Sequence, residues 1–225
     1  MTTIGKLFAG AAMAAASLTS VGASAGVITV DNPSFETLPA AGLPFGCVGS
    51  ACAYSVDAIP GWTNSGDSGQ FQPDVAGNGG FYFNSVPDGI TVGYSNGPTI
   101  SQTVSPLSQA GVTYTLTVAE GFRKDLPDPG AVELVVNGVP TLATGSGVQN
   151  SGDWFDYTAS YTALTSGGAI EVVLNPNGIQ GDWDNVRLTD SVGAVPEPAA
   201  WALMLVGFGV LGSVMRRRTR AAVVA

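Results

Sequence analysis

The segment between Gly26 and Val195 consists of short alternating runs and has no sustained helical periodicity. Residues 114–118 alternate large apolar side chains with threonine, a period of two that buries one face of a strand. Turn signals such as Asn137-Gly138 separate such runs. The other predicted strands are residues 81–83, 90–94, 100–104, 132–136, 154–161, 170–174 and 186–189. This spacing predicts an all-β domain over residues 26–194, a single β-sandwich or jelly roll.

Residues 1–25 have the layout of a secretory signal peptide. Lys6 is their only charge, residues 7–16 are apolar, and Ala23-Ser24-Ala25 stands before Gly26. Small residues at this spacing are typical of a cleavage site. We expect the mature chain to begin near Gly26.

A second apolar run, residues 199–215, lies near the other end of the chain and carries no charge. As a helix it would be roughly 25 Å long, just enough to span a bilayer. Four arginines within residues 216–220 follow it directly, so this end should stay in the cytoplasm and the β domain should lie outside. A buried core helix is disfavoured by these arginines and by the prolines before the run.

Pro196, Glu197 and Pro198 come directly before this run. The order of this short motif, an apolar helix and a basic cluster resembles the PEP-CTERM sorting signal of Gram-negative bacteria, over residues 195–220. The resemblance implies that exosortase reads the three residues as a substrate and removes the tail near them. It also implies transient anchoring in the inner membrane, followed by release to the cell surface or matrix.

Charge and composition exclude several functions. The chain has a formal net charge of −9 at pH 7. Only Arg123, Lys124 and Arg187 are basic between Gly26 and Val195, so the domain should repel nucleic acid. It contains no histidine, the commonest general base and metal ligand.

The two cysteines, Cys47 and Cys52, are close together in the sequence. In an exported domain such a pair is expected to form a disulfide. A zinc site would need two further ligands, and no histidine or third cysteine exists. Residues 39–67 around the pair are rich in glycine and proline and are expected to form a long loop.

Several motifs of the domain together resemble a galactose-binding-like jelly roll, a fold shared by carbohydrate-binding modules. They are NPSFE at residues 32–36, PGW at 60–62, ISQTV at 100–104, GVTYTL at 111–116 and WDNVRL at 183–188. Residues 47–52 and 121–130 depart from that pattern. The resemblance implies a structural calcium site, with Asn32, Glu36 and Asp184 at the matching positions. The alternative is that these three residues make ordinary turn and backbone contacts.

Sugar recognition would require an exposed aromatic ring surrounded by polar groups. Trp154 and Trp183 each stand among aspartates and are expected to be half exposed. With Arg123 they are the predicted ligand-binding residues. Trp62, in the Pro-Gly-Trp turn, is expected in the core.

We therefore expect a non-catalytic exported surface protein. The preferred hypothesis is a binding module for polysaccharide in exopolysaccharide or biofilm, which proteins with this tail commonly accompany. A purely structural or adhesive surface protein is the alternative, and a matrix hydrolase is less favoured. Paired carboxylates alone do not identify such an enzyme, because acidic residues are the usual polar groups of this chain.

Overall fold

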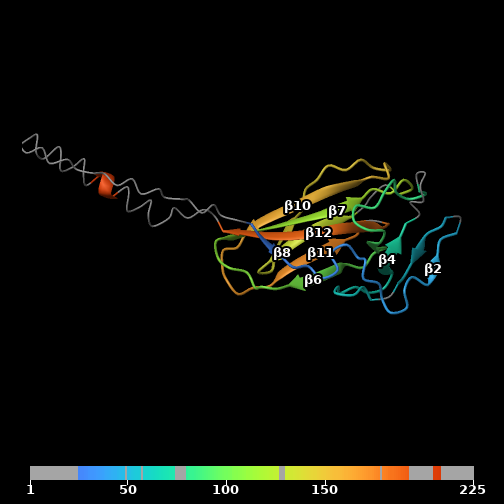
Figure 1. The fold of residues 1–225 in the computed structure, drawn as a ribbon, viewed down its shortest axis with the longest axis horizontal. Helices are drawn as coiled ribbons and strands as arrows, with labels where there is room; N and C mark the ends of the chain where they lie inside the picture. The colour runs from blue at the N-terminus through green and yellow to red at the C-terminus, as the bar shows by residue number, and fades with distance from the viewer. Residues whose placement is uncertain are drawn as a thin grey trace, which may run out of the picture. The chain divides into compact units, whose positions relative to one another are not determined.

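A computed structural model describes residues 25–48, 50–56, 58–73, 80–126, 130–177, 179–192 and 205–208 (Figure 1). The residues Ala23–Gly193 form one compact unit. The expected signal peptide, the Pro196–Pro198 motif and the arginine cluster lie outside the described residues, as does most of the apolar run. Residues 205–208 are helical. Within the described ranges, no helix has the length and apolar character needed to cross a bilayer.

Two antiparallel sheets make up the domain, which confirms the predicted β-sandwich (Figure 1). The 8-stranded sheet has the order β10 (Trp154–Thr162), β7 (Val112–Gly121), β12 (Gly181–Val192), β5 (Val92–Ser95), β4 (Ser68–Gln72), β3 (Ala53–Tyr54) and β2 (Phe45–Gly46), with β1 (Gly26–Ile28) paired to β12. The 4-stranded sheet has the order β6 (Ile100–Val104), β11 (Ile170–Asn175), β8 (Ala131–Val136) and β9 (Val139–Leu142).

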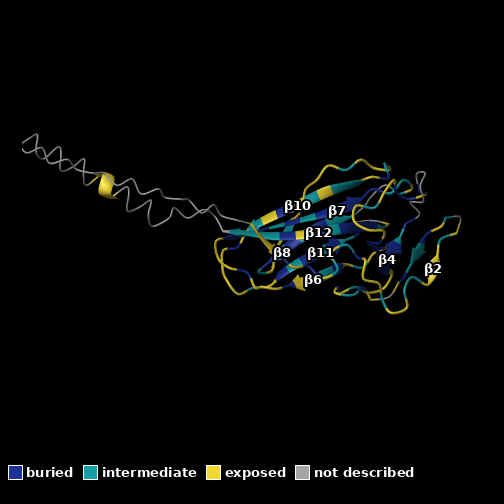
Figure 2. Ribbon diagram, in the orientation of Figure 1, coloured by how far each residue is buried: buried dark blue, intermediate teal, exposed yellow. Residues whose placement is uncertain are grey.

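The main core contains alternate side chains from both sheets. In β7 the buried residues Tyr114, Leu116 and Val118 alternate with half-buried threonines, as the sequence period predicts. Strands β8 and β11 contribute alternate buried positions in the same way (Figure 2). Trp62 belongs to this core, as predicted, and its ring stacks on Phe35 with the centroids 5.2 Å apart.

Strand β12 holds the larger sheet together, because it pairs with β1, β5 and β7. Its register against β7 shifts between Asp184 and Arg187, which is a β-bulge. Trp183 before the bulge and Leu188 after it both belong to the main core. Since successive side chains of a strand point to opposite faces, Asp182 and Asp184 point away from that core.

A second, aromatic cluster lies on that other face of the larger sheet. Tyr94 is opposite Asp182 in the register and therefore shares its face. The buried members of this cluster are Cys52, Phe71, Tyr82, Phe83, Val92 and Tyr94. Residues 81–83 were predicted as a strand, and this prediction is wrong: they form no strand, and Tyr82 and Phe83 place their rings in the aromatic cluster.

Candidate functional site

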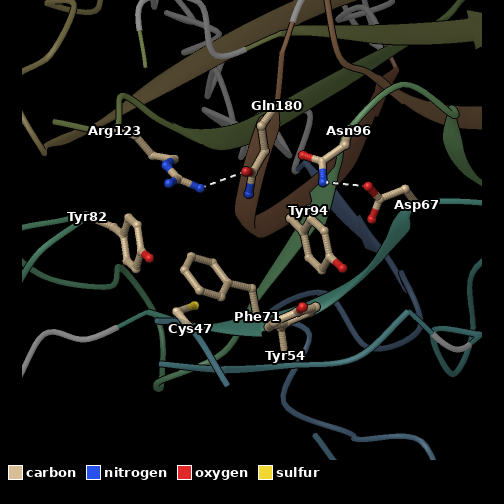
Figure 3. Close-up of a pocket in the computed structure, with 9 residues that line it drawn as sticks. All are labelled: Cys47, Tyr54, Asp67, Phe71, Tyr82, Tyr94, Asn96, Arg123 and Gln180. Atoms are coloured by element: carbon tan, nitrogen blue, oxygen red, sulfur yellow. Dashed lines mark hydrogen bonds between the residues drawn. The ribbon is translucent and has the colours of Figure 1, made fainter. Parts of the chain in front are cut away.

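A pocket of about 190 Å³ opens into the aromatic cluster. Its walls come from the β2–β3 hairpin, from β4 and β5 with the residues beside them, from the connection between these two strands, and from the segments before β8 and β12 (Figure 3). The lining residues are Cys47, Tyr54, Asp67, Phe71, Tyr82, Tyr94, Asn96, Arg123 and Gln180. A cavity of about 150 Å³ accommodates benzene, so this volume suits a single ring.

Four aromatic rings form the walls of the pocket. Phe71 packs edge-on against Tyr82 on one side, with the centroids 5.3 Å apart, and against Tyr94 on the other, at 6.2 Å. Tyr54 makes a further edge contact with Tyr94 at 6.2 Å. Figure 3 shows Tyr82 and Tyr54 on either side of Phe71. Aromatic rings therefore line more than one wall, and Phe71, Tyr82 and Tyr94 among them are buried.

A close backbone approach fixes the position of Tyr94. The Tyr94 hydroxyl donates to the carbonyl oxygen of Ser55 at 2.9 Å. Opposite Tyr94 in β4 stands Gly69, where an added Cβ would lie 2.0 Å from that same carbonyl oxygen. Only glycine lets β4 pass so close to Ser55. Burial, and secondarily the charge of Asp67, raise the pKa of Tyr94, so its hydroxyl remains protonated.

Polar groups converge at one end of the pocket. The Arg123 guanidinium donates from Nε and Nη2 to the two oxygens of Asp125, at 2.9 and 2.8 Å, and from Nη1 to Gln180 Oε1 at 2.6 Å. Its central carbon lies 4.3 Å from the centroid of the Tyr82 ring. Asn96 donates to Asp67 Oδ2 at 2.9 Å on another wall. Burial lowers the pKa of Arg123, but the hydrogen bond to Asp125 and the neighbouring carboxylates outweigh it and raise the pKa.

Asp182 lies behind this polar end and is fully buried. Gln180 Nε2 donates to its Oδ1 at 3.1 Å, so the Gln180 amide bridges Asp182 and Arg123. The other carboxylate oxygen, Asp182 Oδ2, has no hydrogen-bond partner among the described residues. Burial raises the pKa of Asp182 to about 7, although Arg123 and Gln180 oppose the shift. This carboxyl group therefore changes charge near neutral pH.

The raised pKa of Asp182 predicts that the free energy of unfolding falls as the pH rises from about 4 to about 7. The pKa of Asp182 is about 7 in the folded chain against an ordinary value of 3.8, so the folded state binds the proton more tightly. This stabilisation is complete below the unfolded pKa and is lost as the pH rises through the folded pKa. We expect Asp182→Asn to reduce the decline and to be more stable than the parent at pH 8, measured by urea unfolding.

Asp31→Asn is the matched control, because residue 31 is exposed. In the control, the free energy of unfolding should fall with pH as it does in the parent. Asp184 has a pKa of about 7 as well, raised first by burial, so part of the decline should survive in Asp182→Asn. An Asp182→Asn variant with the full decline of the parent would contradict this explanation.

The structure separates the three predicted ligand-binding residues. Arg123 lines the pocket. Trp154 is half-buried, packs at a tilt against Phe83 with the centroids 4.6 Å apart, and donates to the carbonyl oxygen of Ser85 at 2.8 Å. Trp183 is fully buried in the main core. The expectation that Trp183 is half exposed is therefore wrong, because the phase of β12 turns its ring inward and its neighbouring aspartates outward.

Two of the three predicted calcium ligands, Glu36 and Asp184, contact the same backbone segment. Glu36 Oε1 accepts from the amides of Ile90 and Thr91 at 2.7 and 2.6 Å. Asp184 Oδ2 accepts from the amide of Asp88 at 2.9 Å, so both carboxylates bind the segment that precedes β5. Burial is the main cause that raises the pKa of Asp184.

Asn32 has a different role. Its amide nitrogen donates to the carbonyl oxygens of Thr37 and Pro60, both at 3.1 Å, and its Oδ1 accepts from the amide of Thr37 at 2.9 Å. These bonds close a turn and occupy the side chain. Within the described part of the chain, no group of three or more histidine, cysteine or acidic side chains is arranged to hold a metal.

The Cys47–Cys52 disulfide is present, as predicted, with the Cα atoms 5.4 Å apart. The disulfide links the two ends of the connection between β2 and β3, and Cys47 lies in the pocket wall. The prediction of one long loop over residues 39–67 missed these two short strands. Each spans two residues, too few to show a period in the sequence.

Sequence reasoning also missed most of the pocket. Tyr54, Phe71 and Tyr94 come from three strands and meet only when β3, β4 and β5 pair. Gln180 and Asn96 are single amides in connections. Spacing along the chain carries no signal for such a set.

The fold and the pocket define a β-sandwich with a small aromatic site on the outer face of one sheet. Residues 26–189 match the family model described as HpiC1-like, HpiC1 cyclase, and the chain belongs to this family. Residues 194–218 match the model of the PEP-CTERM protein-sorting motif, as predicted from Pro196, Glu197 and Pro198. The motif marks an exported protein that is sorted at the membrane.

Among solved structures, the chain is similar to the CBM22-1 xylan-binding domain of Xyn10C from Paenibacillus barcinonensis. The two share 11% sequence identity with a TM-score of 0.37, over 72% of this chain and 93% of that domain. No curated protein matches the chain.

Proposed function

We propose that this exported protein binds a neutral sugar unit of an extracellular polysaccharide in the aromatic pocket. The observation that carries the proposal is the combination of aromatic walls with converging polar groups in a space suited to one ring. Tyr82 and Phe71 would contact the apolar face of a pyranose. Arg123, Asn96 and Gln180 would exchange hydrogen bonds with its hydroxyl groups, which fixes its orientation.

The charges around the pocket favour a neutral ligand over an acidic one. Arg123 is the one cation among the described residues that line the pocket, and both oxygens of Asp125 already bind it. Asp67 lies in the wall and Asp182 behind it. Because Asp125 neutralises Arg123, the local charge is negative, and it becomes more negative when Asp182 is ionised. An anionic sugar would be repelled by these groups.

The test is a glycan screen with the full-length protein in mild detergent. We expect at least one neutral glycan to be retained and Tyr82→Ala to weaken its binding by tenfold or more, because the variant removes one pocket wall. Tyr161→Ala is the matched control, since Tyr161 packs on the main core and not in the pocket. Isothermal titration gives the dissociation constants.

Retention of no glycan would reject the binding module and favour a purely structural or adhesive surface protein. Equal binding by Tyr82→Ala and the parent would place the sugar elsewhere. Melting curves of both variants show whether each remains folded.

A ring-closing enzyme is the second candidate, because the family is described by a cyclase. Asp182 favours it, since a carboxyl group with a pKa of about 7 suits general acid catalysis near neutral pH. However, Gln180 lines the pocket and hydrogen-bonds Asp182, which is not itself part of the wall. Gln180 would have to move before a ligand could receive the proton, so we rank binding first.

Calcium is a further proposal, supported by the binding of Glu36 and Asp184 to the same backbone segment, residues 88–91. Carboxylates and backbone carbonyls are the ligands that Ca²⁺ prefers. We expect calcium to raise the melting temperature of the parent above that in chelator and to have no effect on a Glu36→Gln, Asp184→Asn double variant. Asp31→Asn should respond like the parent. Identical melting temperatures of the parent with calcium and with chelator would contradict the proposed calcium site.

Sorting by exosortase is proposed to end in removal of the tail near Pro196, Glu197 and Pro198. The matched sorting motif supports this step. We expect mass spectrometry of the surface protein to find no peptide from residues 199–220, and Glu197→Ala to retain them. Intact arginines of residues 216–220 in exported parent protein would instead indicate a permanent anchor.

A further inference from the structure

Six aromatic rings follow one another across the pocket, and we name this series the aromatic belt. Its members in spatial order are Phe45, Tyr54, Tyr94, Phe71, Tyr82 and Phe81, with successive centroids 5.4, 6.2, 6.2, 5.3 and 4.8 Å apart. Four of these rings line the pocket. The two end members, Phe45 and Phe81, are not part of its wall.

The two ends of the belt are open to solvent. Phe81 is 57% exposed and Phe45 is 45% exposed. By contrast, the central ring of Phe71 is 4% exposed. Each exposed ring rests on a pocket tyrosine: Phe81 on Tyr82 and Phe45 on Tyr54. These tyrosines stand on either side of Phe71 (Figure 3), so an exposed ring is attached to each of two walls.

Scattered exposed hydrophobic residues are ordinary on protein surfaces. These two phenylalanines differ because each continues a series of contacts that begins inside the pocket. The pocket suits a single ring, so a lone sugar unit would leave both exposed rings uncovered. A ligand made of several linked rings would cover them.

We propose that the aromatic belt binds a linear neutral saccharide chain, with one sugar ring in the pocket and the adjoining rings over Phe45 and Phe81. This inference rests on the proposed function and names its ligand as a polymer segment of about three or more rings. Stacking on an exposed ring contributes about 1 kcal/mol, which corresponds to about fivefold in affinity. The belt thus predicts that affinity rises with chain length.

The test is isothermal titration of the full-length protein with neutral gluco-, manno-, galacto- and xylo-oligosaccharides of increasing length, beginning with the monosaccharides. We expect the series that binds to gain about fivefold for each end of the belt that it covers. Phe81→Ala and Phe45→Ala should each remove one such gain while leaving monosaccharide binding unchanged. Leu164→Ala is the matched control, because Leu164 is 81% exposed and lies outside the pocket wall.

The outcomes separate the two proposals. If monosaccharide and oligosaccharide bind equally and both phenylalanine variants match the parent, the pocket binds sugar but the belt inference is wrong. If Tyr82→Ala leaves all binding unchanged, or no series binds, the proposed function fails as well. The phenylalanines are exposed, so their variants should melt like the parent, and a large fall in melting temperature would show that these rings serve the fold instead.

Discussion

The bulge in β12 determines which side chains face the core and which face the pocket. Trp183 and Leu188 both enter the main core although they are separated by an odd number of positions, which a regular strand would not permit. The register shift between Asp184 and Arg187 absorbs the extra residue. As a result Asp182 faces away from the main core, where the Gln180 amide connects it to Arg123.

This arrangement lowers the stability of the fold, because it buries the carboxyl group of Asp182. Asp182 is fully buried opposite Tyr94 in the sheet, and its Oδ2 lacks a hydrogen bond from the described residues. A well-packed apolar residue would cost less at such a position. The same group helps to orient Gln180 and, through it, Arg123 above the Tyr82 ring. Stability and orientation of the pocket therefore make opposite demands on position 182.

The sequence predicted those parts of the fold that depend on local rules. The alternation in residues 114–118 reappears as buried and half-buried positions of β7. Asn137-Gly138 forms the turn between β8 and β9, with φ of 55° and 75°, because both residues tolerate positive φ. Trp183 was misplaced because a bulge has no signature in apolar spacing. The pocket remained hidden because its walls are created by strand pairing.

The Cys47–Cys52 bond lies within the same hairpin that carries Phe45 and Tyr54. Disulfides form in oxidising compartments and are rare in the cytoplasm, where thiols are kept reduced. One wall of the pocket is therefore completed only after the chain has left the cytoplasm. Maturation of the site thus follows translocation.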